Sequence, residues 1–196
     1  MSTFTLTDRV RAWSKPFLAP VADFLARLKV SPNTVTICGF LGCILVGIAL
    51  GLGHPRLAGL LLIVFGPLDA IDGLLARRSQ RQTKFGAFLD STLDRYSEIA
   101  IFTGLVFYLL NLGQKFATVL ALVALAGSLM VSYTRARAEA LGFECKIGLL
   151  TRFERLVILT AGLVFNLIYP VLILLAIFTN VTAVQRVLHV WRQSRS

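Results

Sequence analysis

The chain is poor in charged residues. Asp, Glu, Lys and Arg make up 15% of its 196 residues, whereas hydrophobic residues make up 56%. Soluble domains average about 25% charged residues and about 45–50% apolar residues. A disordered chain, collagen and a coiled coil are therefore excluded, and the composition is typical of an integral membrane protein rather than of a water-soluble globule.

Cysteine and histidine are also scarce. The three cysteines, Cys38, Cys43 and Cys145, form no CxxC pair, so we interpret them as packing residues in a reducing compartment. Together with only two histidines they offer no ligand set for zinc. The first 28 residues lack the uninterrupted apolar core of a signal peptide, so no cleaved leader is expected.

Long stretches without charge predict six membrane-spanning helices. A helix needs about 20 residues to cross the hydrocarbon core, and Asn166 with Pro170 indicates a turn inside the longest uncharged run. The predicted spans are 34–53, 57–78, 86–111, 116–138, 152–168 and 170–190. The predicted fold is therefore all-α, a single membrane domain over residues 1–196.

Residues 1–30 carry an amphipathic pattern ahead of these spans. Apolar residues recur every three or four positions and basic residues flank them, as in a helix that lies in the membrane interface. The apolar stripe comprises Leu6, Val10, Trp13, Phe17, Val21, Phe24 and Leu28. We therefore predict an interfacial helix followed by a six-span bundle over residues 34–190.

The basic residues gather on one side of the predicted topology. Of 20 Lys and Arg residues, 17 fall on the side of the two termini, whereas only Arg56 and Lys115 fall on the other side. The positive-inside rule assigns the basic side to the cytoplasm. We therefore expect a multi-pass protein of the cell membrane, with both termini and its active site facing the cytoplasm. The net charge of +10 then reflects loops near anionic lipid, and no nucleic-acid partner is expected.

Half of the acidic residues lie in or beside apolar spans, where an unpaired carboxylate is costly. They are Asp69, Asp72, Asp90, Asp94 and Glu98. Asp69 and Asp72 are three positions apart, and Asp90 and Asp94 are four apart, so each pair projects from one face of its helix. Because the two spans are antiparallel neighbours, all four aspartates are expected at one level near the cytoplasmic side.

Four converging carboxylates repel one another unless cations neutralise them. All-oxygen ligands favour hard ions, so two Mg²⁺ ions are expected, with Mn²⁺ as the alternative. Gly73 and Gly86 lie on the acidic faces and leave room for a ligand, while Arg77 can reach a phosphate bound there. Interhelical pairs of the acids with Arg77 and Arg95 are the alternative explanation.

Residues 69–94 read DAIDGLLARRSQRQTKFGAFLDSTLD. They match the signature D-x2-D-G-x2-A-R-x8-G-x3-D-x3-D at all eight fixed positions, so the chain resembles the CDP-alcohol phosphatidyltransferase family. The resemblance implies an enzyme of phospholipid biosynthesis that transfers a phosphatidyl or archaetidyl group from a CDP-linked lipid to an acceptor hydroxyl and releases CMP. It also implies that Asp69, Asp72 and Asp90 are metal ligands. In the same way, Asp94 is implied to be the general base and to touch the second metal.

The resemblance further implies where the donor, CDP-diacylglycerol or CDP-archaeol, is bound. The expected CDP-lipid contacts are Asn33, Thr34, Val35, Thr36, Gly73, Arg77, Thr83 and Gly86. Ser31 and Asn33 also suit the N-cap of a helix, which is a purely structural explanation for that stretch. A homodimer is expected as well.

Four arginines near the cytoplasmic ends of the later spans suit a phosphorylated polyol as the acceptor. They are Arg135, Arg152, Arg155 and Arg186. Residues 132–142 and 151–156 resemble the phosphatidylinositol-phosphate synthase branch, although Arg135 replaces a Lys and Phe153 replaces a Pro. Inositol phosphate is therefore the expected acceptor and glycerol-3-phosphate the alternative. Ordinary positive-inside charge is the structural explanation of the same arginines.

A divalent-cation transporter is the alternative from a different functional class, because carboxylates within spans also occur along ion pathways. A transporter would move ions without CDP-lipid, whereas the enzyme would release CMP without ion flux. Arg77 and the glycines of the signature favour the enzyme.

Overall fold

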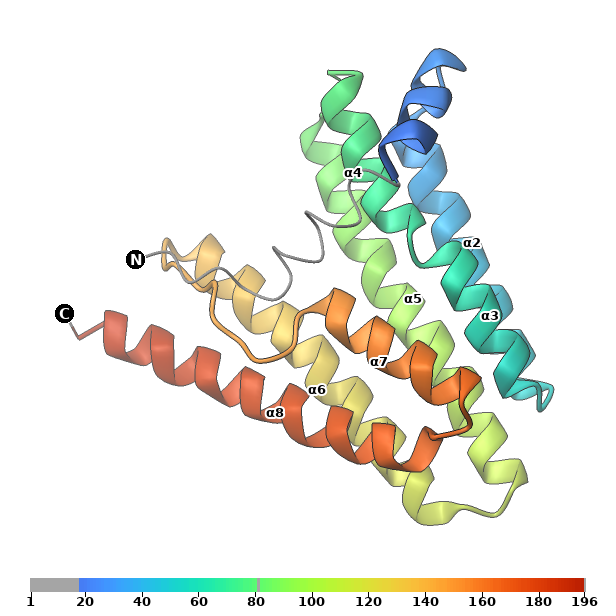
Figure 1. Ribbon diagram of the computed structural model, residues 1–196. Helices are drawn as coiled ribbons and strands as arrows, with labels where there is room; N and C mark the ends of the chain where they lie inside the picture. Colours follow the sequence, from blue (N-terminus) through green and yellow to red (C-terminus); the bar gives the residue numbers. More distant parts are fainter. Residues whose placement is uncertain (1–17, 81, 196) are drawn as a thin grey trace.

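The computed structural model describes residues 18–80 and 82–195, and within them every regular element is an α-helix (Figure 1). The predicted all-α class is thereby confirmed. The labelled helices are α2 (Pro32–Gly51), α3 (Pro55–Phe65), α4 (Leu68–Arg78), α5 (Lys84–Asn111), α6 (Lys115–Ala140), α7 (Arg152–Val164) and α8 (Ile168–Gln193). Residues 18–27 are also helical, whereas positions 1–17 of the predicted interfacial helix lie outside the described residues.

The predicted spans fall on these helices with two differences. The predicted span 57–78 is two helices, α3 and α4, because Pro67 has no backbone N–H to donate and interrupts the helical ladder. The predicted span 152–168 already ends at Val164, and Asn166 takes a positive φ of 57° in the turn that leads to α8.

Four helical stretches of the described residues are long and apolar enough to cross a membrane, which indicates a membrane bundle. They are Pro32–Gly51, Pro55–Arg78, Lys115–Ala140 and Ile168–Gln193. α5 is long enough but carries Asp94, Arg95 and Glu98 in its middle, and α7 has only 13 residues. By length and composition alone, the described residues therefore contain four candidate spans rather than the predicted six.

The helices form two groups that share one end. α2 packs against α3, α4 and α5, while α6 packs against α5 and α8. In Figure 1 the two groups meet near the α5–α6 and α7–α8 turns and diverge toward the other end, with α7 between them. The main apolar core lies at the shared end, where Leu50, Leu109 and Leu163 are almost completely buried.

Two glycines bring α2 and α5 into close contact within this core. A Cβ added to Gly104 would collide with the backbone of Gly47, and a Cβ added to Gly47 would collide with the carbonyl group of Ala100. Small residues allow helices in a membrane to approach closely, and this approach supplies much of their packing energy. α5 is thereby held firmly against α2, and this packing fixes the position of the half of α5 that carries Asp90 and Asp94.

We expect Gly104→Ala to destabilise the protein, because the added methyl group forces α2 and α5 apart. Overpacking of this kind costs about 1–3 kcal/mol. Thermal unfolding in detergent measures the change as a lowered Tm. Gly51→Ala is the matched control, since a Cβ at Gly51 meets nothing within 4 Å. Equal Tm values for the two variants would contradict close packing at Gly104.

Candidate active site

Three carboxylates from two helices meet on one side of the bundle. Asp69 lies in the first turn of α4, and Asp90 and Asp94 lie on α5. One carboxylate oxygen from each residue lies within 4.8 Å of the others. α4 and α5 are joined by a short connection that reverses the chain, so the acidic faces of the two helices oppose each other.

Asp72, the fourth aspartate, lies behind this cluster rather than within it. Its side chain is buried, and its Oδ2 accepts a hydrogen bond of 2.6 Å from the hydroxyl of Thr36 on α2. Asp72 and Asp69 nevertheless line the same small pocket, together with Thr36, Ser97 and Arg152. The pocket thus joins the acidic cluster to the first half of α2.

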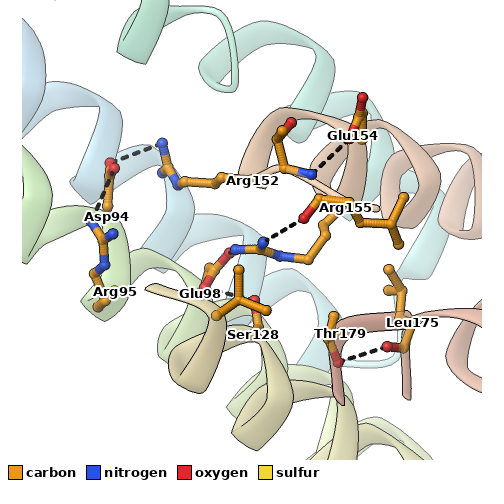
Figure 2. Close-up of polar contacts among 12 residues, drawn as sticks. Asp94, Arg95, Glu98, Ser128, Arg152, Glu154, Arg155, Leu175 and Thr179 are labelled. Carbon is orange, nitrogen blue, oxygen red and sulfur yellow. Dashed lines mark hydrogen bonds and ion pairs between the residues drawn. The ribbon is translucent and has the colours of Figure 1, made fainter. Parts of the chain in front are cut away.

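Arg152, the first residue of α7, neutralises part of the acidic cluster. Its Nη1 lies 2.6 Å from Oδ1 of Asp69. The same atom lies 2.8 Å from Oδ1 of Asp94 (Figure 2). Arg95 lies 3.5 Å from the other oxygen of Asp94. Arg152 was expected among the arginines for the acceptor phosphate, and it stands directly at the carboxylates. Spacing along the chain does not reveal this contact, because Arg152 is 58 positions from Asp94.

The donor set of the cluster fits a divalent cation. All the candidate ligands are carboxylate oxygens, which hard ions such as Mg²⁺ and Mn²⁺ prefer. Oδ1 of Asp90 is buried and has no hydrogen-bond partner among the described residues. A buried oxygen without a partner is costly unless it accepts a hydrogen bond or binds a cation, so the cluster is suited to hold a metal ion.

The residues predicted to bind the nucleotide face different ways. Asn33 and Thr83 both approach Gly86, since a Cβ built there would lie 3.1 Å from Oδ1 of Asn33 and 3.0 Å from Oγ1 of Thr83. Thr83 caps α5 by accepting a hydrogen bond of 2.9 Å from the Gly86 amide. Val35 is instead buried in an apolar cluster, and Thr34 is exposed.

The start of α2 corrects one structural expectation. Ser31 occupies the N-cap position but makes no side-chain capping bond, and the helix begins with Pro32. Asn33 lies inside the first turn and is not a cap. Proline suits this first position because its fixed φ is already helical and the first turn leaves its amides unpaired. The capping explanation is therefore wrong for Asn33, whose side chain turns toward Gly86 instead.

The other three predicted acceptor arginines, like Arg152, have partners within the protein. Arg135 is exposed and pairs with Glu139 at 2.8 Å on the same helix. Arg155 is buried and pairs with Glu98 at 2.7 Å. Arg186 is buried, donates a 2.9 Å hydrogen bond to the carbonyl of Ile147 and also donates to that of Val131.

These three arginines still form one neighbourhood. Arg186 lies within electrostatic reach of both Arg135 and Arg155. Arg155 follows Arg152 by three positions on α7, so the arginine group borders the acidic cluster. A phosphate monoester that exchanges for the internal partners would therefore stand beside the carboxylates.

Comparison with known proteins agrees with the site. Residues 29–189 match the family model of CDP-alcohol phosphatidyltransferases. The chain is 37% identical over 195 residues to an archaetidylinositol phosphate synthase of Methanothermobacter thermautotrophicus, and the alignment covers 96% of both chains. The resemblance drawn from residues 69–94 is thereby confirmed.

Solved structures of a similar fold come from phosphatidylinositol phosphate synthase of Mycobacterium tuberculosis. One, with CDP-DAG bound, has a TM-score of 0.82 and 31% identity, and the match covers 89% of this chain and 93% of that chain. Another, in complex with manganese and citrate, has a TM-score of 0.81 and 30% identity, covering 89% of this chain and 88% of that chain.

We expect Arg152→Gln to bind Mn²⁺ more tightly than the unchanged protein. A metal ion at Asp69 and Asp94 would compete with Arg152 for their oxygens, and an ion pair of this exposure contributes up to about 1 kcal/mol, or about fivefold in affinity. Titration of Mn²⁺ followed by its electron paramagnetic resonance signal measures the change. Arg192→Gln, at the end of α8, is the control. Unchanged or weaker Mn²⁺ binding in Arg152→Gln would show that the arginine does not compete.

Proposed function

The chain belongs to the CDP-alcohol phosphatidyltransferase family, and we propose that it transfers a phosphatidyl or archaetidyl group from a CDP-linked lipid to inositol phosphate, releasing CMP. One observation carries the proposal: the family signature forms a three-carboxylate cluster whose open side is bordered by arginines. Relatives named archaetidylinositol phosphate synthase and phosphatidylinositol phosphate synthase support this acceptor.

The donor is proposed to lie along α2, α4 and the start of α5. Gly86 leaves a space between Asn33 and Thr83, and Gly73 has only the tip of Arg77 near its open side. Polar side chains around a space without a Cβ can surround a diphosphate and a nucleoside closely. The full set proposed for CDP-lipid comprises Asn33, Thr34, Val35, Thr36, Gly73, Arg77, Thr83 and Gly86. CDP-DAG in the M. tuberculosis neighbour supports a donor of this class.

The four aspartates are proposed to hold two divalent cations, with Mg²⁺ as the physiological ion. The unpartnered oxygen of Asp90 and the proximity of Asp69 and Asp94 support metal binding. Manganese in a structural neighbour supports a hard cation as well. The chemistry that such ions supply is neutralisation of the diphosphate and of the charge that develops on departing CMP.

Asp94 is proposed to accept the proton of the attacking hydroxyl. Its carboxylate lies in the acidic cluster and also contacts Arg152 at the start of α7, so it stands between the donor side and the arginines. As the proton moves to Asp94, the acceptor oxygen forms a bond to the lipid-side phosphorus, and the bond from that phosphorus to CMP breaks. Most of the rate enhancement then comes from alignment of the two substrates and from fixed charge.

The acceptor phosphate is proposed to bind Arg135, Arg152, Arg155 and Arg186. A phosphate monoester near pH 7 carries a charge of about −1.5 to −2, and it must stand beside an anionic diphosphate. The arginines next to the acidic cluster offset that repulsion and offer paired N–H donors to phosphate oxygens.

We also propose that α5 and α7 complete a six-span bundle whose two termini and active site face the cytoplasm of a cell membrane. The basic ends of α4, α6 and α8 support this orientation. At the same end, residues 18–27 are held by Arg78, which contacts Asp23, and expose Val21 and Phe24. An exposed apolar face of this kind supports an interfacial position. A homodimer is part of the same proposal.

Purified protein with CDP-diacylglycerol and Mg²⁺ is expected to release CMP with inositol phosphate, and to do so poorly with free inositol, glycerol or serine. Arg155→Ala is expected to raise the KM for inositol phosphate at least about tenfold, because a charge-assisted hydrogen bond contributes about 1.5–3 kcal/mol. CMP release across the panel measures both effects. Faster turnover with glycerol-3-phosphate than with inositol phosphate would identify glycerol-3-phosphate as the acceptor. Mg²⁺ flux into proteoliposomes without CDP-lipid would favour a transporter.

Asp94→Asn is expected to lower kcat at least about 100-fold, because a general base contributes about 10²–10⁴-fold. Binding of CDP-diacylglycerol should survive, since the base acts only in the transition state. CMP release and binding of the lipid, measured on the same preparation, test the two halves of this expectation. Glu144→Gln, an exposed acid in the α6–α7 connection, is the control. Near-normal turnover by Asp94→Asn would exclude Asp94 as the base.

A further inference from the structure

Glu98 is a buried carboxylate that the family signature does not contain. It lies on α5, one helical turn beyond Asp94, and its side chain is 11% exposed. Its Oε1 pairs with Nη2 of Arg155 on α7 at 2.7 Å, and its Oε2 accepts a 2.9 Å hydrogen bond from Ser128 on α6 (Figure 2). One side chain therefore joins three helices.

The contact belongs to a pair of parallel contacts between α5 and α7. Asp94 and Glu98 are four positions apart on α5, and Arg152 and Arg155 are three apart on α7, so each pair shares a helix face. Asp94 contacts Arg152, and Glu98 contacts Arg155. The first contact is partly open, whereas the second is closed off from solvent.

α7 contacts α5 mainly through side chains rather than through close packing of the two helix backbones. The backbone of α7 packs closely against α3 and α8, whereas the backbones of α7 and α5 lie farther apart. A pocket between the helices is lined by Glu98, Ser128, Arg155 and Thr179 together with apolar residues. An ion pair across such a space fixes both distance and direction, because its hydrogen bonds require one geometry.

We propose that Glu98 is a positioning residue: through Arg155 it fixes the first turn of α7 and so sets Arg152 and Arg155 against the acidic cluster. Glu98 itself touches neither substrate. The proposal rests on the proposed function, in which these two arginines hold the phosphate of the acceptor. The donor half, α2, α4 and α5, is assembled by packing of α4 and α5 against α2, which does not involve α7.

Glu98→Gln is the first test, because the amide keeps the shape and an acceptor for Ser128 but removes the charge. We expect the KM for inositol phosphate to rise at least about fivefold, as for loss of a charged hydrogen-bond partner. The KM for CDP-diacylglycerol is expected to stay within twofold. Thr118→Val, which removes a hydroxyl that donates to the carbonyl of Gln114 at the start of α6, is the control for a merely structural loss.

Glu98→Gln leaves the buried charge of Arg155 without its ion-pair partner, which can prevent folding. Ser128→Ala is therefore the second test. It removes only the hydroxyl contact with Glu98, so a smaller rise in the same KM, about twofold or more, is expected. A lowered Tm with an unchanged KM for inositol phosphate in the variant that folds would overturn the proposal. An equal rise in the KM for both substrates would also overturn it.

A distance measurement without substrates separates this proposal from the proposed function. Spin labels are attached at Phe88→Cys on α5 and Phe153→Cys on α7, two exposed positions, in a background without the three native cysteines. Double electron–electron resonance is expected to show a broader or shifted distance distribution in Glu98→Gln but not in Thr118→Val. Identical distributions would overturn the positioning role, whichever acceptor the enzyme uses.

Discussion

Mutual repulsion of carboxylates inside an apolar bundle is the constraint on which the rest of this structure depends. Asp69, Asp90 and Asp94 approach one another closely, with Asp69 exposed and the other two half-buried. Such a cluster persists only when positive charge is supplied. Arg152 supplies part of it from α7, and the all-oxygen ligand set is suited to bind a divalent cation. The same repulsion favours the binding of a metal ion, because the charge of a cation relieves an existing cost.

The backbone holds the acids in place by different means on the two helices. α5 is fixed by close glycine contact with α2, so Asp90 and Asp94 stand on a rigid base. α4 begins anew after Pro67, which puts Asp69 in a first turn whose free amides favour a negative charge. The interruption therefore has a local electrostatic consequence, since a continuous helix would offer Asp69 no such terminus.

The sequence predicts the helices and the acidic cluster well because both depend on local spacing. Uncharged runs locate the helices, and aspartates at i, i+3 and i, i+4 define faces that a short connection must bring together. Spacing does not reveal which residue of a distant helix completes a contact. Arg152 was expected at the acceptor, and Ser128 was not singled out at all, because their partners on α5 are 58 and 30 positions away. Pro67 shows a different limit of prediction. The helix break at Pro67 is local, but the apolar run continues past it, so the run is predicted as one continuous span.

The two halves of the molecule differ in how they are joined, and this difference has a consequence for specificity. The half that carries the signature is held by apolar and glycine packing between α2, α4 and α5, which leaves little freedom at the carboxylates. α7 meets that half through apolar contacts and through three ion pairs, two from Arg152 and one from Arg155, whose geometry depends on a few side chains. Substitutions on α6 and α8, or of Arg155 on α7, can therefore change what is held opposite the carboxylates, whereas a substitution of Arg152 also alters the carboxylates that it pairs with. Under the proposed function, the chemistry common to the family and the choice of acceptor thus depend on different parts of the fold, which meet at Arg152.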